Sequence, residues 1–150
     1  FRDCDLSEDG ERQARELKLD VEGAIVVASP LRRAVRTALL AFEEFPIIVH
    51  PAVVERGSGV PENMPRSADV LEAEFPASVD LSLLRTDGWP RKQTEEDLAQ
   101  FVNWLSSRPE QKIIVVCHQN TIVKLTRAGG QVPNCMPIEC TIEGDWLRKV

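Results

Sequence analysis

The sequence holds few of the residues that build metal sites. It has only two histidines, His50 and His118, and its four cysteines are scattered with no Cys-x-x-Cys pair. Because structural zinc takes four cysteine or histidine ligands at short spacings, we expect no metal site. We interpret the cysteines as reduced structural thiols, Cys117 included, which is typical of a cytoplasmic protein. His50, which precedes a proline, is likewise interpreted as structural.

Excess positive charge and long apolar runs are also missing. The formal net charge is -6, which argues against a nucleic-acid binder, because such proteins need a basic face. A few arginines gathered in one pocket could still hold a small anion. No apolar run approaches about 18 residues, so we expect no membrane-spanning segment.

What the chain does contain is two short β-branched runs, GAIVVA at 23–28 and KIIVVC at 112–117. Runs of this kind are typical of strands buried on both faces of a parallel sheet. Further short strands are expected at 46–50 and 138–142. Because helical stretches alternate with the strands, we predict one α/β domain over residues 1–150, with a mostly parallel sheet and helices on both faces.

Start signals and apolar spacing predict five helices. Ser29 is the expected N-cap of the second, with Pro30 at its first position. Thr94 is the expected N-cap of the fourth, and Asp97 three residues later resembles a capping box. The predicted ranges are 8–17, 30–42, 69–74, 95–106 and 119–125, the last ending near Gly129. The stretch 56–66, rich in Gly and Pro, is interpreted as a functional loop.

Polar residues follow the two β-branched runs. Ser29 and then Arg32 and Arg33 follow the first, and His118 and Gln119 follow the second. Ligands of α/β sheets bind at the carboxyl ends of strands. A helix N-terminus beside an arginine suits a phosphate, because both present N–H donors and positive charge. These residues therefore predict a pocket for an oxyanion or phosphate.

Each charged residue has a simpler interpretation as well. Arg32 and Arg36 lie four apart, so they are expected to share one solvated helix face. Arg33, taken alone, could be a surface residue, and Glu55 could be one more exposed carboxylate.

Four motifs occur in a familiar order. They are DLSEDGERQA at 5–14, SPLRRAVRTA at 29–38, VE at 54–55 and IVVCH at 114–118. Together they resemble the phosphoglycerate-mutase-like branch of the histidine phosphatase superfamily, and the resemblance covers almost the whole chain.

The resemblance implies a role for each site residue. Arg33 would clamp the phosphate, and His118 would bind the transferred phosphoryl group. Glu55 would protonate the leaving oxygen. Gln119 would stand at a phosphate-binding position where the family usually has glycine. The implied reaction is a phosphatase's, less readily a phosphomutase's, on a small phosphorylated metabolite through a phosphohistidine, with no metal and no cofactor.

The family's nucleophilic histidine stands in an Arg-His-Gly motif that should precede Asp5. The sequence has no Arg-His pair. We therefore expect the domain to be N-terminally incomplete, with the first strand missing and the nucleophile outside these 150 residues. Two alternatives stay open. The protein could be an inactive family member that binds a phosphorylated ligand or a protein partner, or a homodimer in which another copy supplies the strand.

Overall fold

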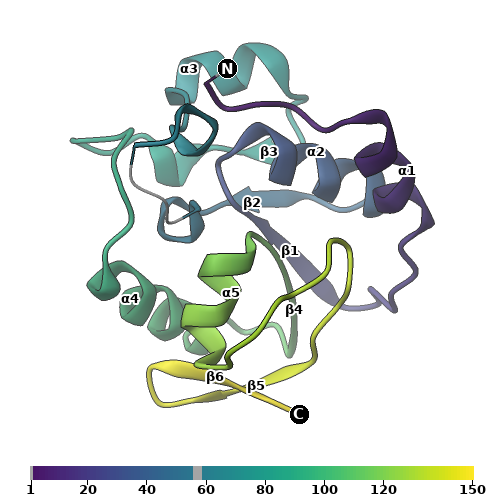
Figure 1. Cartoon of the computed structure of the whole chain (residues 1–150), viewed down its shortest axis with the longest axis vertical. Helices are drawn as coiled ribbons and strands as arrows, with labels where there is room; N and C mark the ends of the chain where they lie inside the picture. The colour runs from purple at the N-terminus through teal and green to yellow at the C-terminus, as the bar shows by residue number, and fades with distance from the viewer. Residues whose placement is uncertain (1, 56–58) are drawn as a thin grey trace.

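The computed structural model of the chain describes residues 2–55 and 59–150. Its centre is a sheet of four parallel strands in the order β3-β2-β1-β4 (Figure 1). The strands are β1 (Ala24–Ala28), β2 (Ile47–Val49), β3 (Val79–Asp80) and β4 (Lys112–Val116). The predicted parallel α/β sheet is confirmed, and β3 is a strand that the sequence pattern did not reveal.

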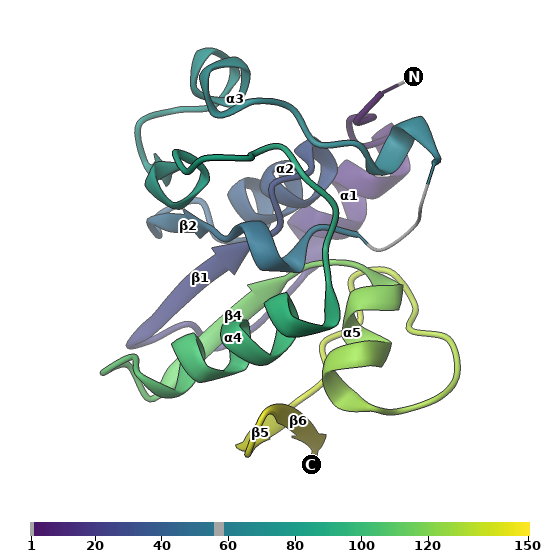
Figure 2. The same ribbon diagram turned by 90° about the vertical axis from the view of Figure 1, so that its left-hand side faces the viewer.

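Helices cover both faces of the sheet, as predicted (Figure 2). One face carries α1 (Glu8–Glu16), α2 (Arg32–Ala41) and α3 (Ala68–Glu74), and the other carries α4 (Glu95–Ser106) and α5 (Gln119–Thr126). No helix in the described ranges is both long and apolar enough to cross a membrane.

The core is divided by the sheet into two halves, and β1 serves both. Val26 and Ala28 pack with the α2 and α3 side, whereas Val27 packs with α4 and α5. This alternation follows from the two-residue repeat of a strand. Burial on both faces explains why β1 is a continuous apolar run.

The helix starts show where local signals decide and where they do not. Thr94 caps α4 in a full capping box with Asp97, as predicted. The predicted start of α2 is wrong, because the helix begins at Arg32 and Leu31 is its N-cap residue. Ser29 does not cap this helix. Its hydroxyl accepts a hydrogen bond from Leu31 N at 3.3 Å and faces another strand end.

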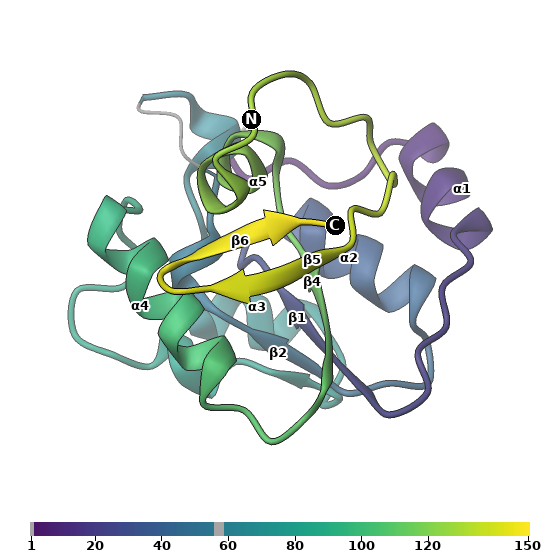
Figure 3. The same ribbon diagram turned by 90° about the horizontal axis from the view of Figure 1, so that it is seen from below.

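The C-terminal region also departs from prediction. In place of one strand at 138–142, an antiparallel hairpin forms from β5 (Cys140–Glu143) and β6 (Trp146–Lys149) (Figure 3). Helix α5 ends at Thr126, within one residue of the predicted range 119–125, because Arg127 adopts a left-handed conformation with φ of 52°. A groove of about 520 Å³ separates β4 from the hairpin.

Among the described residues, short 3-10 turns complete the connections, at Pro51–Val53, Pro61–Asn63 and Ser82–Leu84. Of the loop predicted at 56–66, residues 56–58 lie outside the described residues.

Candidate functional site

His118 and Ser29 meet at the carboxyl edge of the sheet. Strands β1 and β4 are neighbours in register, with Ala28 opposite Val116, so the residues that follow them come together. His118 Nε2 lies 2.7 Å from Ser29 Oγ, and both side chains are buried. The two strand ends that the sequence singled out are therefore linked by a side-chain hydrogen bond.

Burial sets the protonation state of His118. Loss of water around the ring, followed by the nearby positive charge of Arg33, lowers the pKa of His118 to about 3. At neutral pH the imidazole is therefore uncharged. A hydrogen bond from Leu31 N already reaches Ser29 Oγ, so the hydroxyl proton of Ser29 is available to the ring nitrogen.

Arg33 stands in the first turn of α2, and a loop holds its guanidinium. Nη1 donates to the carbonyl of Glu62 at 2.9 Å, and Nη2 donates to Oδ1 of Asn63 at 2.8 Å. Its charge is close enough to lower the pKa of His118. The two residues predicted to bind phosphate therefore act on each other electrostatically.

Arg32 and Arg36 do not form the solvated face that their spacing predicted. Arg32 makes a bidentate contact with Glu74, with Nε–Oε2 and Nη2–Oε1 distances of 2.8 and 2.7 Å. Arg36 Nη2 donates to Asp5 Oδ2 at 2.8 Å and to Glu74 Oε1 at 3.0 Å. The expectation failed because α3 and the N-terminal segment cover this face with carboxylates. These arginines link α2 to α3 and to the N-terminal segment. Their contacts indicate a structural role and not a ligand-binding one.

Asp3 lies beside the start of α2, and the sequence motifs did not reveal it. It is fully buried, and Oδ1 accepts a hydrogen bond from the main-chain N of Arg32 at 2.8 Å. Burial raises the pKa of Asp3, and this outweighs the opposing effects of the Arg32 N–H and of the charges on Arg32, Arg33 and Arg66. Oδ2 has no hydrogen-bond partner among the described residues. Asp3 thus supplies the start of α2 with the acceptor that Leu31 lacks.

Glu55 follows the 3-10 turn after β2 and lies at the same edge of the sheet. Its negative charge contributes to the raised pKa of Cys117, which directly precedes His118. The carbonyl just before Glu55, that of Val54, accepts hydrogen bonds from Gln93 and Thr121. The structure therefore brings Glu55 close to the His118 strand end.

Gln119 is the first residue of α5, and its side chain is exposed. His118 is the N-cap residue, but within the described part of the chain its side chain makes no capping hydrogen bond. The start of α5 therefore presents main-chain donors and the positive end of the helix dipole beside His118.

His50 and Cys117 have the structural character predicted for them. His50 packs against Phe101 and Trp104, its Nδ1 accepts from Ala52 N at 3.1 Å, and burial lowers its pKa to about 4. Burial raises the pKa of Cys117 to about 12, so the thiol stays protonated and is a poor nucleophile. Within the described ranges no cluster of three or more histidine, cysteine, aspartate or glutamate side chains could hold a metal ion.

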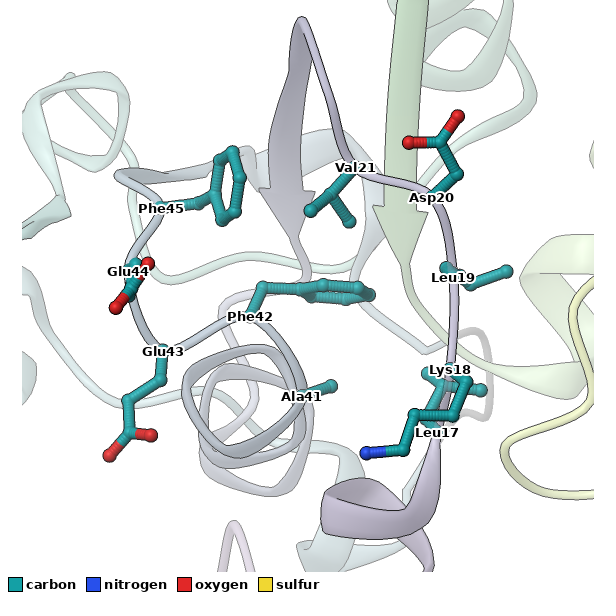
Figure 4. A pocket seen from close by; sticks show the side chains of 10 residues that line it. All are labelled: Leu17, Lys18, Leu19, Asp20, Val21, Ala41, Phe42, Glu43, Glu44 and Phe45. Atoms are coloured by element: carbon teal, nitrogen blue, oxygen red, sulfur yellow. The ribbon is translucent and has the colours of Figure 1, made fainter.

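A hollow of about 490 Å³ lies at the opposite end of the sheet (Figure 4). Segments 17–21 and 41–45, which precede β1 and β2, line it around Phe42. Three of its lining residues are acidic, Asp20, Glu43 and Glu44, and one is basic, Lys18. This charge balance disfavours a phosphate.

Solved structures share the fold of this chain. An alpha-ribazole phosphatase of Shigella flexneri is 20% identical, with a TM-score of 0.58 over 97% of this chain and 82% of that one. The mycobacterial glucosyl-3-phosphoglycerate phosphatase Rv2419c is 18% identical, with a TM-score of 0.58 over 99% and 86%. The protein TTHB049 of Thermus thermophilus is 27% identical, with a TM-score of 0.52 over 89% and 76%.

Curated proteins yield no match. The family model "Histidine phosphatase superfamily (branch 1)" matches residues 2–138, which include all four motifs and the strand ends that carry Ser29 and His118. The chain belongs to the histidine phosphatase superfamily, branch 1.

Proposed function

We propose that the protein is a phosphatase for small phosphorylated metabolites and that the phosphoryl group binds between His118, Arg33 and the start of α5. The observation that carries the proposal is the position of His118. It lies at a strand end, at the first turn of α5, and within electrostatic reach of Arg33. Phosphoryl transfer needs mainly placement and charge neutralisation, and these groups offer both.

Each group has one task in the proposed reaction. Arg33 neutralises charge on the phosphoryl oxygens, while His118 and the main-chain N–H of Gln119 donate to them. Glu55 gives its proton to the leaving oxygen as the P–O bond to the metabolite breaks. In the second half-reaction the resulting carboxylate takes a proton from the water that attacks phosphorus.

The proposed nucleophile is a histidine other than His50 and His118. His50 packs against Phe101 and Trp104, and His118 Nε2 lies 2.7 Å from Ser29 Oγ. The bond that forms joins this nucleophile to phosphorus, which gives a phosphohistidine that water then hydrolyses. Two proteins with the same fold are an alpha-ribazole phosphatase and a glucosyl-3-phosphoglycerate phosphatase, which agrees with the proposed class.

The test is turnover of an aryl phosphate by the protein as its gene encodes it, with acid-quenched trapping of labelled phosphate on histidine. His118→Ala and Arg33→Ala should each lower kcat by about 10²–10³-fold, as loss of a comparable oxyanion donor does. The control is Arg85→Ala, because Arg85 forms exposed ion pairs with Asp69 and Glu72 on the molecular surface. Unchanged turnover in both site variants would exclude the proposed roles.

One observation favours a second candidate, ligand binding without turnover. His50 packs against Phe101 and Trp104, and His118 lies against Ser29, so neither is placed as a nucleophile. If this candidate is right, vanadate or phosphate will raise the melting temperature of the gene product while no aryl phosphate is hydrolysed.

A further inference from the structure

Gln93 is a buried polar residue outside every motif that the family match explains. Its side chain lies just before α4, and Nε2 donates to two main-chain carbonyls, those of Ala52 and Val54, both at 2.7 Å. These carbonyls belong to the turn that leads into Glu55. One amide group therefore holds both ends of a three-residue stretch whose next residue is the proposed acid.

Thr121 reaches the same stretch from the other side. Its side chain is fully buried on the first turn of α5, and Oγ1 donates to the carbonyl of Val54 at 3.2 Å. Gln93 Nε2 also lies 3.4 Å from Thr121 Oγ1. Thr121 stands three residues after His118, so the helix that His118 begins is bonded to the peptide unit that precedes Glu55.

We propose that Gln93 and Thr121 form a clamp that fixes Glu55 relative to His118, and that both are positioning residues for leaving-group protonation. This inference rests on the proposed function and adds residues to its site. The carbonyl of Val54 and the N–H of Glu55 share one planar peptide unit, so holding the carbonyl fixes the direction in which the Glu55 backbone continues. A misplacement of about 1 Å can cost about 10²-fold in rate, so such a clamp matters to catalysis.

The orientation of the Gln93 amide follows from its neighbours. Only the NH₂ group can face two carbonyl oxygens, because an oxygen there would meet two acceptors. Oε1 is consequently buried without a hydrogen-bond partner among the described residues. A buried polar atom without a partner reduces stability. That cost is expected where a residue is kept for geometry, and a residue kept only for stability would avoid it.

The experiment compares two substrates in the protein as its gene encodes it. An aryl phosphate has a good leaving group and needs little help from an acid, whereas an alkyl phosphate needs protonation. Glu55→Gln should lose about 10²–10⁴-fold in kcat on the alkyl phosphate and far less on the aryl phosphate. Gln93→Glu and Thr121→Val should show the same bias, with losses of about 10–10²-fold on the alkyl phosphate.

Two further variants separate positioning from general damage. Thr121→Ser keeps the hydroxyl and should restore alkyl phosphate turnover to within about threefold of the wild type, as expected when the hydrogen bond is kept. Thr126→Val is the matched control, since Thr126 is buried on the same helix but donates to that helix's own Ile122 carbonyl. Amide exchange at residues 52–55 should quicken in Thr121→Val and stay unchanged in Thr126→Val.

The outcomes are distinguishable. If Glu55→Gln loses activity equally on both substrates, the acid role of Glu55 in the proposed function is wrong. If Glu55→Gln shows the bias and the Gln93 and Thr121 variants do not, the clamp is wrong while the proposed function stands. An equal loss on both substrates in Thr121→Val, or the same bias in Thr126→Val, would also overturn the clamp. Should Gln93→Glu fail to fold, the Thr121→Val and Thr121→Ser pair decides alone.

Discussion

Two strand-to-helix junctions stand side by side at the carboxyl edge of the sheet, and they treat the start of the helix differently. After β1, the carboxylate of Asp3 bonds the N–H of Arg32, and Arg32 and Arg36 are tied to Asp5 and Glu74. After β4, helix α5 begins at His118 without a capping bond from that side chain in the described part of the chain.

The difference agrees with the anion position proposed above. A helix start that already holds a carboxylate has its N–H donors and part of its dipole engaged by the protein itself. The start of α5 offers those groups to a ligand, with His118 beside them and the charge of Arg33 nearby. One junction is thus built for rigidity, and the other is suited to binding. The start of α4, which has a complete capping box, is a third helix start with which those of α2 and α5 can be compared.

Among the three helix starts, the largest effect on stability is expected at α4. Asp97 accepts from the Thr94 main chain at 2.7 Å and from Arg91 Nη1 at 2.8 Å, and these bonds, Arg91 first, lower its pKa to about 2. Asp97→Asn should lower the free energy of unfolding by up to about 2 kcal/mol at neutral pH, from the difference between the ordinary and the lowered pKa.

The pH dependence of this loss checks its cause. A lowered pKa stabilises the fold fully above the ordinary aspartate value of 3.8, and the contribution disappears as the pH falls through about 2. Urea unfolding of the wild type and Asp97→Asn should therefore converge toward the acid end. A difference that stayed constant across that window would assign the effect to packing instead.

A smaller loss is expected at the β1 junction. Asp3→Ala removes the acceptor at the start of α2 and should cost about 1–2 kcal/mol of unfolding free energy, as loss of a helix cap does. Asp3→Asn should cost less, because its amide oxygen can still accept from Arg32 N. Urea denaturation of both variants measures this. Equal losses would mean that the carboxylate's charge beside the arginines matters more than the cap.

The smallest effect is expected at the α5 junction. The Gln119 side chain is exposed, so Gln119→Ala should change the free energy of unfolding by no more than about 0.5 kcal/mol. Phosphate affinity, measured by calorimetry, should change about twofold at most, because the proposed contact is the main-chain N–H. A tenfold loss would make the Gln119 side chain itself the ligand.

The parts of the fold that local signals control could be predicted from the sequence. Strands β1, β2 and β4, helix α1 with Ser7 as its N-cap, and helix α4 with Thr94 as its N-cap all follow from neighbours within a few residues. Strand ends and helix starts, which mark ligand sites in α/β sheets, predicted this edge of the sheet as the site, and the family resemblance selected Arg33 over Arg32. The ligand roles of His118 and Arg33 stay predictions.

Contacts between distant segments could not be predicted. Asp3 reaches Arg32 across 29 positions, and Gln93 reaches Val54 across 39. Ser29 looked like a local cap, but a histidine 89 positions away binds it instead. For Arg32 and Arg36, periodicity gave the face of the helix but not the carboxylates that cover it. A clue to Gln93 was its place directly before the capping residue Thr94, where its side chain can point back to the sheet edge.

The central claim, that His118 is the group that meets a phosphoryl anion, can be tested by NMR titration of the two histidine rings with and without inorganic phosphate. Burial and Arg33 lower the pKa of His118 to about 3, and burial lowers that of His50 to about 4. A bound anion favours the charged ring. Phosphate should raise the pKa of His118 and leave that of His50 unchanged. No change at His118, or an equal change at both rings, would contradict it.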